Sequence, residues 1–259
     1  MTQPAGVVYL VGAGPGAPDL LTLRAARLLA RADIVFHDAL VHPEKLALAA
    51  HAVKIAVGKR SGKHSTAQRF INKQLIDAAQ KYQTVVRLKG GDPMLFGRAQ
   101  EEIDALLEAG VTLDIVPGVS AAFAASAELH CSLTRRALSR SVVFATPREA
   151  AGSKQNEWAK AAAAADTAVL YMAAGEARAV SDALMANGVP ASCPAVIVEN
   201  ASSDHRKVIP TTVGNLPAAA QCVGSGPALV MVGEVYAEVR AAIAGDVMSP
   251  ARLSVYRSG

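Results

Sequence analysis

The first half of the chain repeats one pattern: a short apolar run, a loop that contains Gly or Pro, and then apolar residues at helical spacing. A run that is apolar at every position is typical of a strand buried on both faces. Such strands in alternation with helices predict an open parallel sheet with helices on both faces. The predicted strands are Val7–Gly12, Ile34–His37, Val53–Val57, Thr84–Leu88 and Thr112–Val116, and the predicted helices are Leu20–Ala32, Pro43–Ala50, Gln68–Tyr82 and Arg98–Ala109.

The alternation is less regular after Pro117–Gly118, which favours a mixed sheet in the second half. An Ala-rich helix, Val119–Ala127, leads away from this point. We therefore expect an N-terminal α/β domain over residues 1–118, a C-terminal α/β domain over 119–245, and a loosely ordered tail over 246–259. The second domain has predicted strands at Ser141–Ala145, Thr167–Met172, Pro194–Val198, Lys207–Thr212 and Ala228–Val232, and helices at Asn156–Ala165, Glu176–Asn187 and Leu216–Cys222.

The composition fits this architecture. Half of the 259 residues are hydrophobic (51%), enough for a substantial core, but only 4% are aromatic, which suits helices packed on parallel strands better than a β-sandwich. The formal net charge of +4 is compatible with nucleic acid, anionic lipid or a polyanionic small substrate.

Metal and disulfide chemistry are not indicated. The three cysteines lie far apart without a CxxC motif, and the six histidines form no HExxH motif, so we expect no metal site. The N-terminus has no signal-peptide pattern, and no run approaches the ~18 apolar residues of a membrane helix. A cytoplasmic location without a membrane partner is the expectation.

The loop Gly12–Ala17 (GAGPGA) follows a buried strand and precedes a helix, as the dinucleotide-binding fingerprint does. Asp38 ends the next strand, where a ribose ligand would stand, so an NAD-dependent oxidoreductase is one interpretation. Pro15 and Pro18 weaken it because they remove backbone N–H donors from the phosphate loop. The helical pattern also begins only near Leu20.

Two further loops follow predicted strands, namely Lys89–Pro93 (KGGDP) and Val116–Ala121 (VPGVSA). Ligands of open parallel sheets bind beyond the carboxyl ends of the strands. Glycines there permit close backbone approach, and Asp92 offers a carboxylate. Three loops of this kind predict one ligand crevice.

These and other segments resemble the uroporphyrinogen-III C-methyltransferases, a branch of the tetrapyrrole methylase family, over about residues 7–236. The matching segments are Val11–Ala25, VGKRSGKH (Val57–His64), VRLKGGDPMLFGRAQEE (Val86–Glu102), VPGVSAAFAAS (Val116–Ser126), VLYM (Val169–Met172), VENAS (Val198–Ser202) and PALVMVGEV (Pro227–Val235).

The resemblance implies two α/β domains with the active site in a trough between them, and a homodimer. It implies S-adenosyl-L-methionine as methyl donor and S-adenosyl-L-homocysteine as product. The implied reaction methylates C2 and C7 of uroporphyrinogen III and gives precorrin-2, for sirohaem or cobalamin biosynthesis. A related precorrin methyltransferase is the alternative within the family.

The resemblance also implies site residues. Asp38 matches the family's proton acceptor and Lys59 its proton donor. The matching cofactor positions are Pro15, Gly90, Gly91, Asp92, Leu95, Ser120, Ala121, Met172 and Ala201.

Substrate carboxylates require cations, and arginine suits their bidentate pairing. The candidates include Lys59, Arg60, Lys63, His64, Lys89 and Arg135, but Arg98 and Arg136 are preferred because they lie in matching motifs.

The chain departs from the family pattern at Ala99–Gln100, at Glu128–Ser132, at Arg135 and at Pro147–Arg148, all on the expected substrate side. A nucleic-acid-binding module or ribose methyltransferase is a further alternative suggested by the basic charge. The chain lacks the aromatic platforms typical of single-strand binders, so we expect no nucleic-acid partner.

Overall fold

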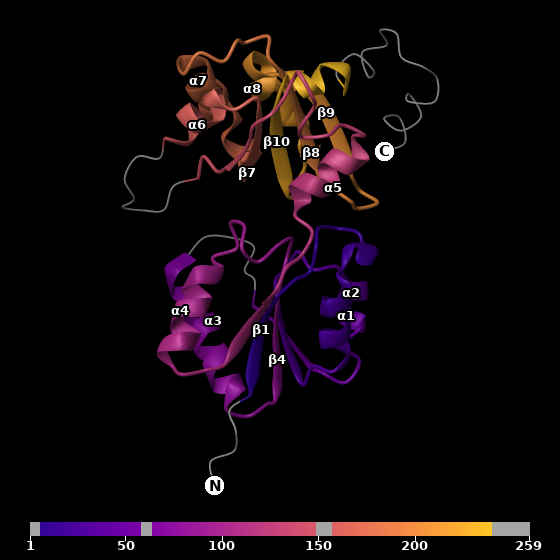
Figure 1. Ribbon diagram of the computed structural model, residues 1–259, viewed down its shortest axis with the longest axis vertical. Helices are drawn as coiled ribbons and strands as arrows, with labels where there is room; N and C mark the ends of the chain where they lie inside the picture. Colours follow the sequence, from indigo (N-terminus) through magenta and orange to yellow (C-terminus); the bar gives the residue numbers. More distant parts are fainter. Residues whose placement is uncertain (1–5, 58–63, 149–156, 240–259) are drawn as a thin grey trace. The chain divides into compact units, whose positions relative to one another are not determined.

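The computed structural model describes residues 6–57, 64–148 and 157–239. The chain divides into two compact units, Met1–Ser120 and Ala121–Gly259, each with its own sheet and core (Figure 1). They are called the first and the second unit below. In the part of the chain that is described, no helix has the length and apolarity needed to cross a membrane.

The first unit contains a five-stranded sheet with the order β3-β2-β4-β1-β5, and every pairing in it is parallel. The prediction of an open parallel sheet is therefore confirmed. The central strands are buried because helices cover both faces. The strands are β1 (Val7–Gly12), β2 (Ile34–His37), β3 (Val53–Ala56), β4 (Thr84–Lys89) and β5 (Leu113–Val116).

Two pairs of helices cover this sheet, one on each face (Figure 1). Helices α3 and α4 cover the apolar cluster of Leu10, Phe36 and Val85, and α1 packs on the cluster that contains Val35 and Val86. The helices are α1 (Leu23–Ala30), α2 (Pro43–Ala47), α3 (His64–Ala79) and α4 (Ala99–Glu108), with a 3₁₀ turn, η1 (Pro18–Leu20).

The second unit contains a mixed five-stranded sheet with the order β6-β7-β10-β8-β9, as predicted. β6 and β7 are parallel, whereas β10 runs antiparallel to both β7 and β8. The strands are β6 (Val142–Ala145), β7 (Thr167–Tyr171), β8 (Pro194–Glu199), β9 (Lys207–Thr212) and β10 (Ala228–Gly233).

Each face of the second sheet has its own apolar cluster. One lies under α6, α7 and α8, and the other lies under α5 and includes the buried Tyr236. The helices are α5 (Ala121–Glu128), α6 (Trp158–Ala164), α7 (Ala177–Ala186) and α8 (Leu216–Ala219), and the 3₁₀ turns are η2 (Ala174–Glu176), η3 (Val213–Asn215), η4 (Ala220–Cys222) and η5 (Glu234–Tyr236). The expected tail, 246–259, lies outside the described residues.

Candidate functional site

The three glycine loops meet at the carboxyl end of the first sheet, because β4, β1 and β5 are neighbours there. Gly14 and Gly91 exchange backbone hydrogen bonds of 3.1 and 2.8 Å, and Ala13 N donates to Lys89 O at 2.7 Å. The third loop joins them through Gly118 N, which donates to Asp92 Oδ2 at 2.9 Å.

Two glycines are required by the contact between these loops. A Cβ atom on Gly118 would lie 2.4 Å from Gly91 O, and one on Gly12 would lie 2.6 Å from Gly118 Cα. Both contacts are with backbone, so a side chain at either position would force the loops apart. These glycines pack protein against protein.

Gly90 and Gly91 are different. A Cβ atom on Gly90 would meet only Leu40 Cβ, at an ordinary 3.7 Å, and one on Gly91 would meet nothing within 4 Å. Gly91 also has a left-handed backbone, with φ of 69°. The KGGDP loop therefore presents its backbone to open space, which a ligand can approach closely.

Asp92 ties this loop together. Its Oδ1 accepts a hydrogen bond from Met94 N at 2.8 Å, and its Oδ2 accepts the one from Gly118 N. Leu95, the next predicted cofactor position, is partly buried and donates its N–H to Asp92 O at 3.3 Å. The carboxylate holds two loops in register and retains lone pairs for a ligand.

The buried side chain of Lys45 stabilises the first glycine loop. The Nζ atom of Lys45 donates to the carbonyl of Pro15, and the lysine is 1% exposed. Burial lowers the pKa of Lys45 to about 8, against the opposing effect of Asp19. The sequence pattern did not point to this residue.

The geometry of the first loop does not suit a pyrophosphate. Ala13 N and Gly14 N are engaged by the KGGDP loop. Helix α1 starts only at Leu23, and the side chain of Thr22 already accepts from Ala25 N at its N-terminus. A dinucleotide fingerprint needs free N–H groups at a helix that follows the glycines directly.

Asp38 follows β2 at the same end of the sheet and is partly buried. Its Oδ1 accepts a hydrogen bond from Arg87 Nη2 at 2.6 Å, within an ion pair. Its Oδ2 lies 3.4 Å from Gly90 N, at the long limit of a hydrogen bond. One oxygen is thus held firmly, and the other is held weakly beside the KGGDP loop.

A buried charged network, which the sequence analysis missed, continues from Asp38. It consists of Arg87, Lys89, Glu102 and Gln68. Glu102 Oε1 accepts from Arg87 Nε at 3.1 Å and from Gln68 Nε2 at 3.2 Å. Its Oε2 accepts from Lys89 Nζ at 2.9 Å. Lys89, expected as a cation for substrate carboxylates, is instead 3% exposed and paired inside the protein.

The pKa values of the two cations in this network shift in opposite directions, although burial acts to lower both. Burial, and then the nearby Arg87 charge, lower the pKa of Lys89 despite Glu102. Burial also opposes the charge of Arg87, but the carboxylates of Asp38 and Glu102 outweigh it and raise the pKa of Arg87. Arg87 and Lys89 lie two residues apart in a strand that is otherwise mostly apolar. That spacing was the one feature of the sequence that could have indicated a pair of buried cations.

Arg98 caps α4 with a left-handed backbone, φ of 55°. Its exposed guanidinium forms two hydrogen bonds with Glu101, of 2.7 and 2.6 Å. These bonds raise the pKa of Arg98 and lower that of Glu101. Exposed ion pairs contribute little stability, so a substrate carboxylate can replace Glu101 at small cost.

Lys59, Arg60 and Lys63 lie outside the described residues. The backbone of His64 begins α3, but its side chain is not among those described.

The remaining predicted cofactor positions lie at one end of the second sheet, except Ser120, which is buried and ends the first unit. β7 and β8 both run antiparallel to β10, so the carboxyl ends of β7 and β8 lie at the same end of the sheet. Met172 follows β7 with φ of 57°, and Ala201 follows β8. Ala121 begins α5, where Ala122 N donates to Tyr171 Oη at 3.3 Å.

Arg136 is exposed in a tight loop closed by backbone hydrogen bonds between Arg135 and Ser139, of 2.9 and 2.8 Å. Its neighbour Arg135 pairs with Glu238 at 2.9 Å. Glu128, on the helix that precedes this loop, accepts from Ser202 N at 2.9 Å and pairs with Arg206 at 3.4 Å rather than with Arg136.

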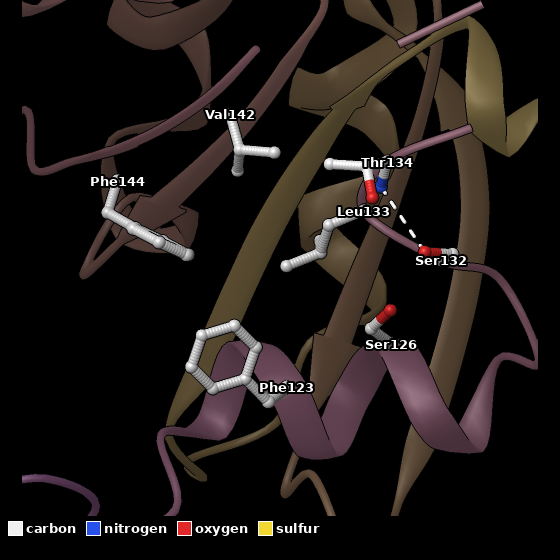
Figure 2. A pocket seen from close by; sticks show the side chains of 7 residues that line it. All are labelled: Phe123, Ser126, Ser132, Leu133, Thr134, Val142 and Phe144. Carbon is white, nitrogen blue, oxygen red and sulfur yellow. Dashed lines mark hydrogen bonds between the residues drawn. The ribbon is translucent and has the colours of Figure 1, made fainter. Parts of the chain in front are cut away.

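A hollow of about 310 Å³ lies beside this loop and is shown in Figure 2. Phe123 of α5 and Phe144 of β6 pack edge to face, with ring centroids 5.9 Å apart. Ser132, which ends the segment that departs from the family pattern, lines it together with Leu133 and Thr134. The complete lining is Phe123, Ser126, Ser132, Leu133, Thr134, Val142 and Phe144.

Comparisons with known proteins show which family this chain resembles along its length. The family model for tetrapyrrole (corrin/porphyrin) methylases matches residues 7–217. Siroheme synthase from Chromobacterium violaceum is 43% identical over 233 residues, which are 89% of this chain and 50% of that protein. The chain thus spans about half the length of the curated relatives it matches.

Two solved structures are also similar. Uroporphyrin-III C-methyl transferase from Thermus thermophilus, complexed with S-adenyl homocysteine, is 35% identical with a TM-score of 0.78, covering 90% of this chain and 100% of that one. A cobalt precorrin-4 methyltransferase is 28% identical with a TM-score of 0.77, covering 88% and 95%. These matches leave the NAD-dependent oxidoreductase without support, in agreement with the geometry of the first loop.

Proposed function

Because the chain belongs to the tetrapyrrole (corrin/porphyrin) methylase family, we propose that it methylates C2 and C7 of uroporphyrinogen III and yields precorrin-2. The methyl donor is S-adenosyl-L-methionine, and S-adenosyl-L-homocysteine is the second product. Precorrin-2 then serves sirohaem or cobalamin biosynthesis.

The observation that carries this proposal is the open backbone at Gly90 and Gly91, where three glycine loops meet. Pro15, Asp92 and Leu95 surround that point from the first unit and fit a cofactor that is bound largely by backbone groups. Ser120, Ala121, Met172 and Ala201 supply the remaining cofactor contacts.

The residues needed for the chemistry are few. The sulfonium of the bound cofactor supplies an electrophilic methyl group, and a porphyrinogen pyrrole carbon is electron-rich. The protein then acts mainly by holding its ligands in alignment, which can lower the activation barrier by up to about 7–11 kcal/mol. Asp38 accepts the proton that the macrocycle releases or opposes its developing positive charge, and Lys59 is the proton donor.

Arg98 and Arg136 bind substrate carboxylates in this proposal. Both are exposed arginines, and a planar guanidinium pairs with a carboxylate through two parallel hydrogen bonds. We also propose that the protein is cytoplasmic and forms a homodimer, and sedimentation velocity of the purified chain tests the dimer.

A cobalt-precorrin or precorrin substrate is the second candidate, favoured by the similarity to cobalt precorrin-4 methyltransferase.

Calorimetric titration with S-adenosyl-L-homocysteine tests the cofactor site, with NADH as a negative control. Turnover is then followed as S-adenosyl-L-homocysteine formed per macrocycle. Two equivalents from uroporphyrinogen III support the proposal, whereas turnover confined to precorrins supports the second candidate.

A further inference from the structure

The charged network beneath Asp38 replaces apolar packing at one end of the first core. Residues two apart on a strand share a face, so Val85, Arg87 and Lys89 form one row on β4. Val85 packs in the apolar cluster under α3 and α4. Further along the row the side chains are charged, and Glu102 of α4 meets them.

Stability alone does not account for this arrangement. Glu102 is fully buried, and Arg87 and Lys89 are each 3% exposed. Desolvation costs several kcal/mol per buried ion, and replacing such groups by apolar residues is often neutral or stabilising. Buried charges that perturb one another are common at functional sites. The network reaches solvent at Asp38, whose side chain is 31% exposed.

We infer that Arg87 is a positioning residue for methyl transfer, which, together with Glu102, fixes the orientation of the Asp38 carboxylate. The inference rests on the proposed function and on the proton-accepting role of Asp38 within it. Arg87 bonds Oδ1 at 2.6 Å and leaves Oδ2 with only the 3.4 Å contact to Gly90 N. The Nε of the same guanidinium donates to Glu102. Arg87 therefore cannot turn away from Asp38 without also breaking its hydrogen bond with the buried carboxylate of Glu102.

The charges around Asp38 predict how variants change the pH dependence of turnover. Arg87 and Lys89 face it from β4, Glu102 lies behind them on α4, and His37 precedes it on β2 with Nδ1 near Asp38 O. Removing a positive charge disfavours an ionised carboxylate, and removing a negative charge favours it. Arg87→Met and Glu102→Gln break the same network but change the charge in opposite directions.

The test is kcat against pH for methyl transfer to uroporphyrinogen III, with both ligands saturating and the full chain. We expect Arg87→Met to lose at least tenfold in kcat and to move the acid limb about one pH unit upward or more. Glu102→Gln should move that limb downward. Arg24→Met is the control, because Arg24 pairs with Asp114 in an exposed ion pair of the same unit, and it should keep the wild-type limb.

Opposite displacements distinguish positioning from a loss of structure, which would move both variants in the same direction. If the wild type is active but the acid limb is unmoved in both variants, or moves the same way in both, the inference about Arg87 is overturned while the proposed function stands. If Arg87→Met does not fold, the direction of the Glu102→Gln displacement decides. A wild-type chain that transfers no methyl group contradicts the proposed function and this inference with it.

Discussion

Gly91 combines a left-handed backbone, φ of 69°, with open space where a side chain would project. We predict that Gly91→Val abolishes binding of S-adenosyl-L-homocysteine in calorimetry, because the new side chain fills the space that the ligand needs. Gly110→Val is a matched control, since Gly110 has φ of 68° and nothing within 4 Å. Both variants should lose stability, by about 1–2 kcal/mol for the left-handed backbone. Unchanged affinity in Gly91→Val would misplace the site.

Asp38 is held by Arg87 at one oxygen, and asparagine can keep that hydrogen bond. We predict that Asp38→Asn binds the cofactor within about twofold of the wild type but loses at least a hundredfold in kcat, as general acid–base groups typically contribute. Asp104→Asn, an exposed change on α4, should keep full turnover. A rise in KM alone, with kcat intact, would make Asp38 a binding residue.

Arg136 is exposed, and Glu128 is engaged by Ser202 and Arg206 instead. We therefore predict that Arg136→Ala raises KM for the tetrapyrrole roughly ten- to a hundredfold, for a charged hydrogen bond of about 1.5–3 kcal/mol. Its melting temperature and cofactor affinity should not change. Arg136→Lys should recover part of the loss, and Arg178→Ala, an exposed arginine of α7, should have no effect. A lowered melting temperature with wild-type KM contradicts this role.

Lys45 on α2 supports the first glycine loop from within the core. Its pKa is about 8 in the folded chain and about 10.4 in an unfolded one. Between these values the unfolded state binds more protons, so the contribution of Lys45 to stability rises with pH across that window. Below it, both states are protonated and the fold bears the cost of a buried charge.

We predict that the free energy of unfolding of wild type minus that of Lys45→Met increases as pH is raised from about 7 to about 10. Urea unfolding at several pH values measures it. Lys160→Met, at an exposed lysine of α6, should differ from wild type by a constant amount. If the difference in unfolding free energy between wild type and Lys45→Met does not change with pH, the pKa of Lys45 is not lowered by folding.

Most strands of both sheets were predictable because apolar residues dominate them and polar or glycine-containing loops bound them, although β3, β4 and β9 also contain lysine, arginine or threonine. β1, β2 and β9 begin and end at the predicted residues. Helix ends were less predictable because local hydrogen bonds decide them. Thr22, for example, starts α1 at Leu23 instead of at the predicted Leu20, and residues Pro18–Leu20 form a 3₁₀ turn.

The charged side chains of the core were not predicted, because patterns assign charged residues to the surface. Lys45, Arg87 and Glu102 are buried through specific partners that lie far away in the sequence. The same holds for Gly12 and Gly118. A glycine in a loop suggested approach to a ligand, but these two allow one loop to contact another.

The whole chain joins two units of different topology, and residues proposed for the cofactor follow strands in each of them. Pro15, Gly90, Gly91, Asp92 and Leu95 belong to the parallel sheet, and Met172 and Ala201 to the mixed sheet. The resemblance extended over both units, which is why it predicted contributions from each. The account therefore requires the intact chain for methyl transfer.

Isotope transfer tests the central claim most directly. The purified chain is incubated without oxygen with uroporphyrinogen III and S-adenosyl-L-methionine that carries a labelled methyl group, and the tetrapyrrole is analysed by mass spectrometry. The account predicts a product with two labelled methyl groups, at C2 and C7. A tetrapyrrole that gains no label, while the same chain binds S-adenosyl-L-homocysteine, would contradict the proposed substrate.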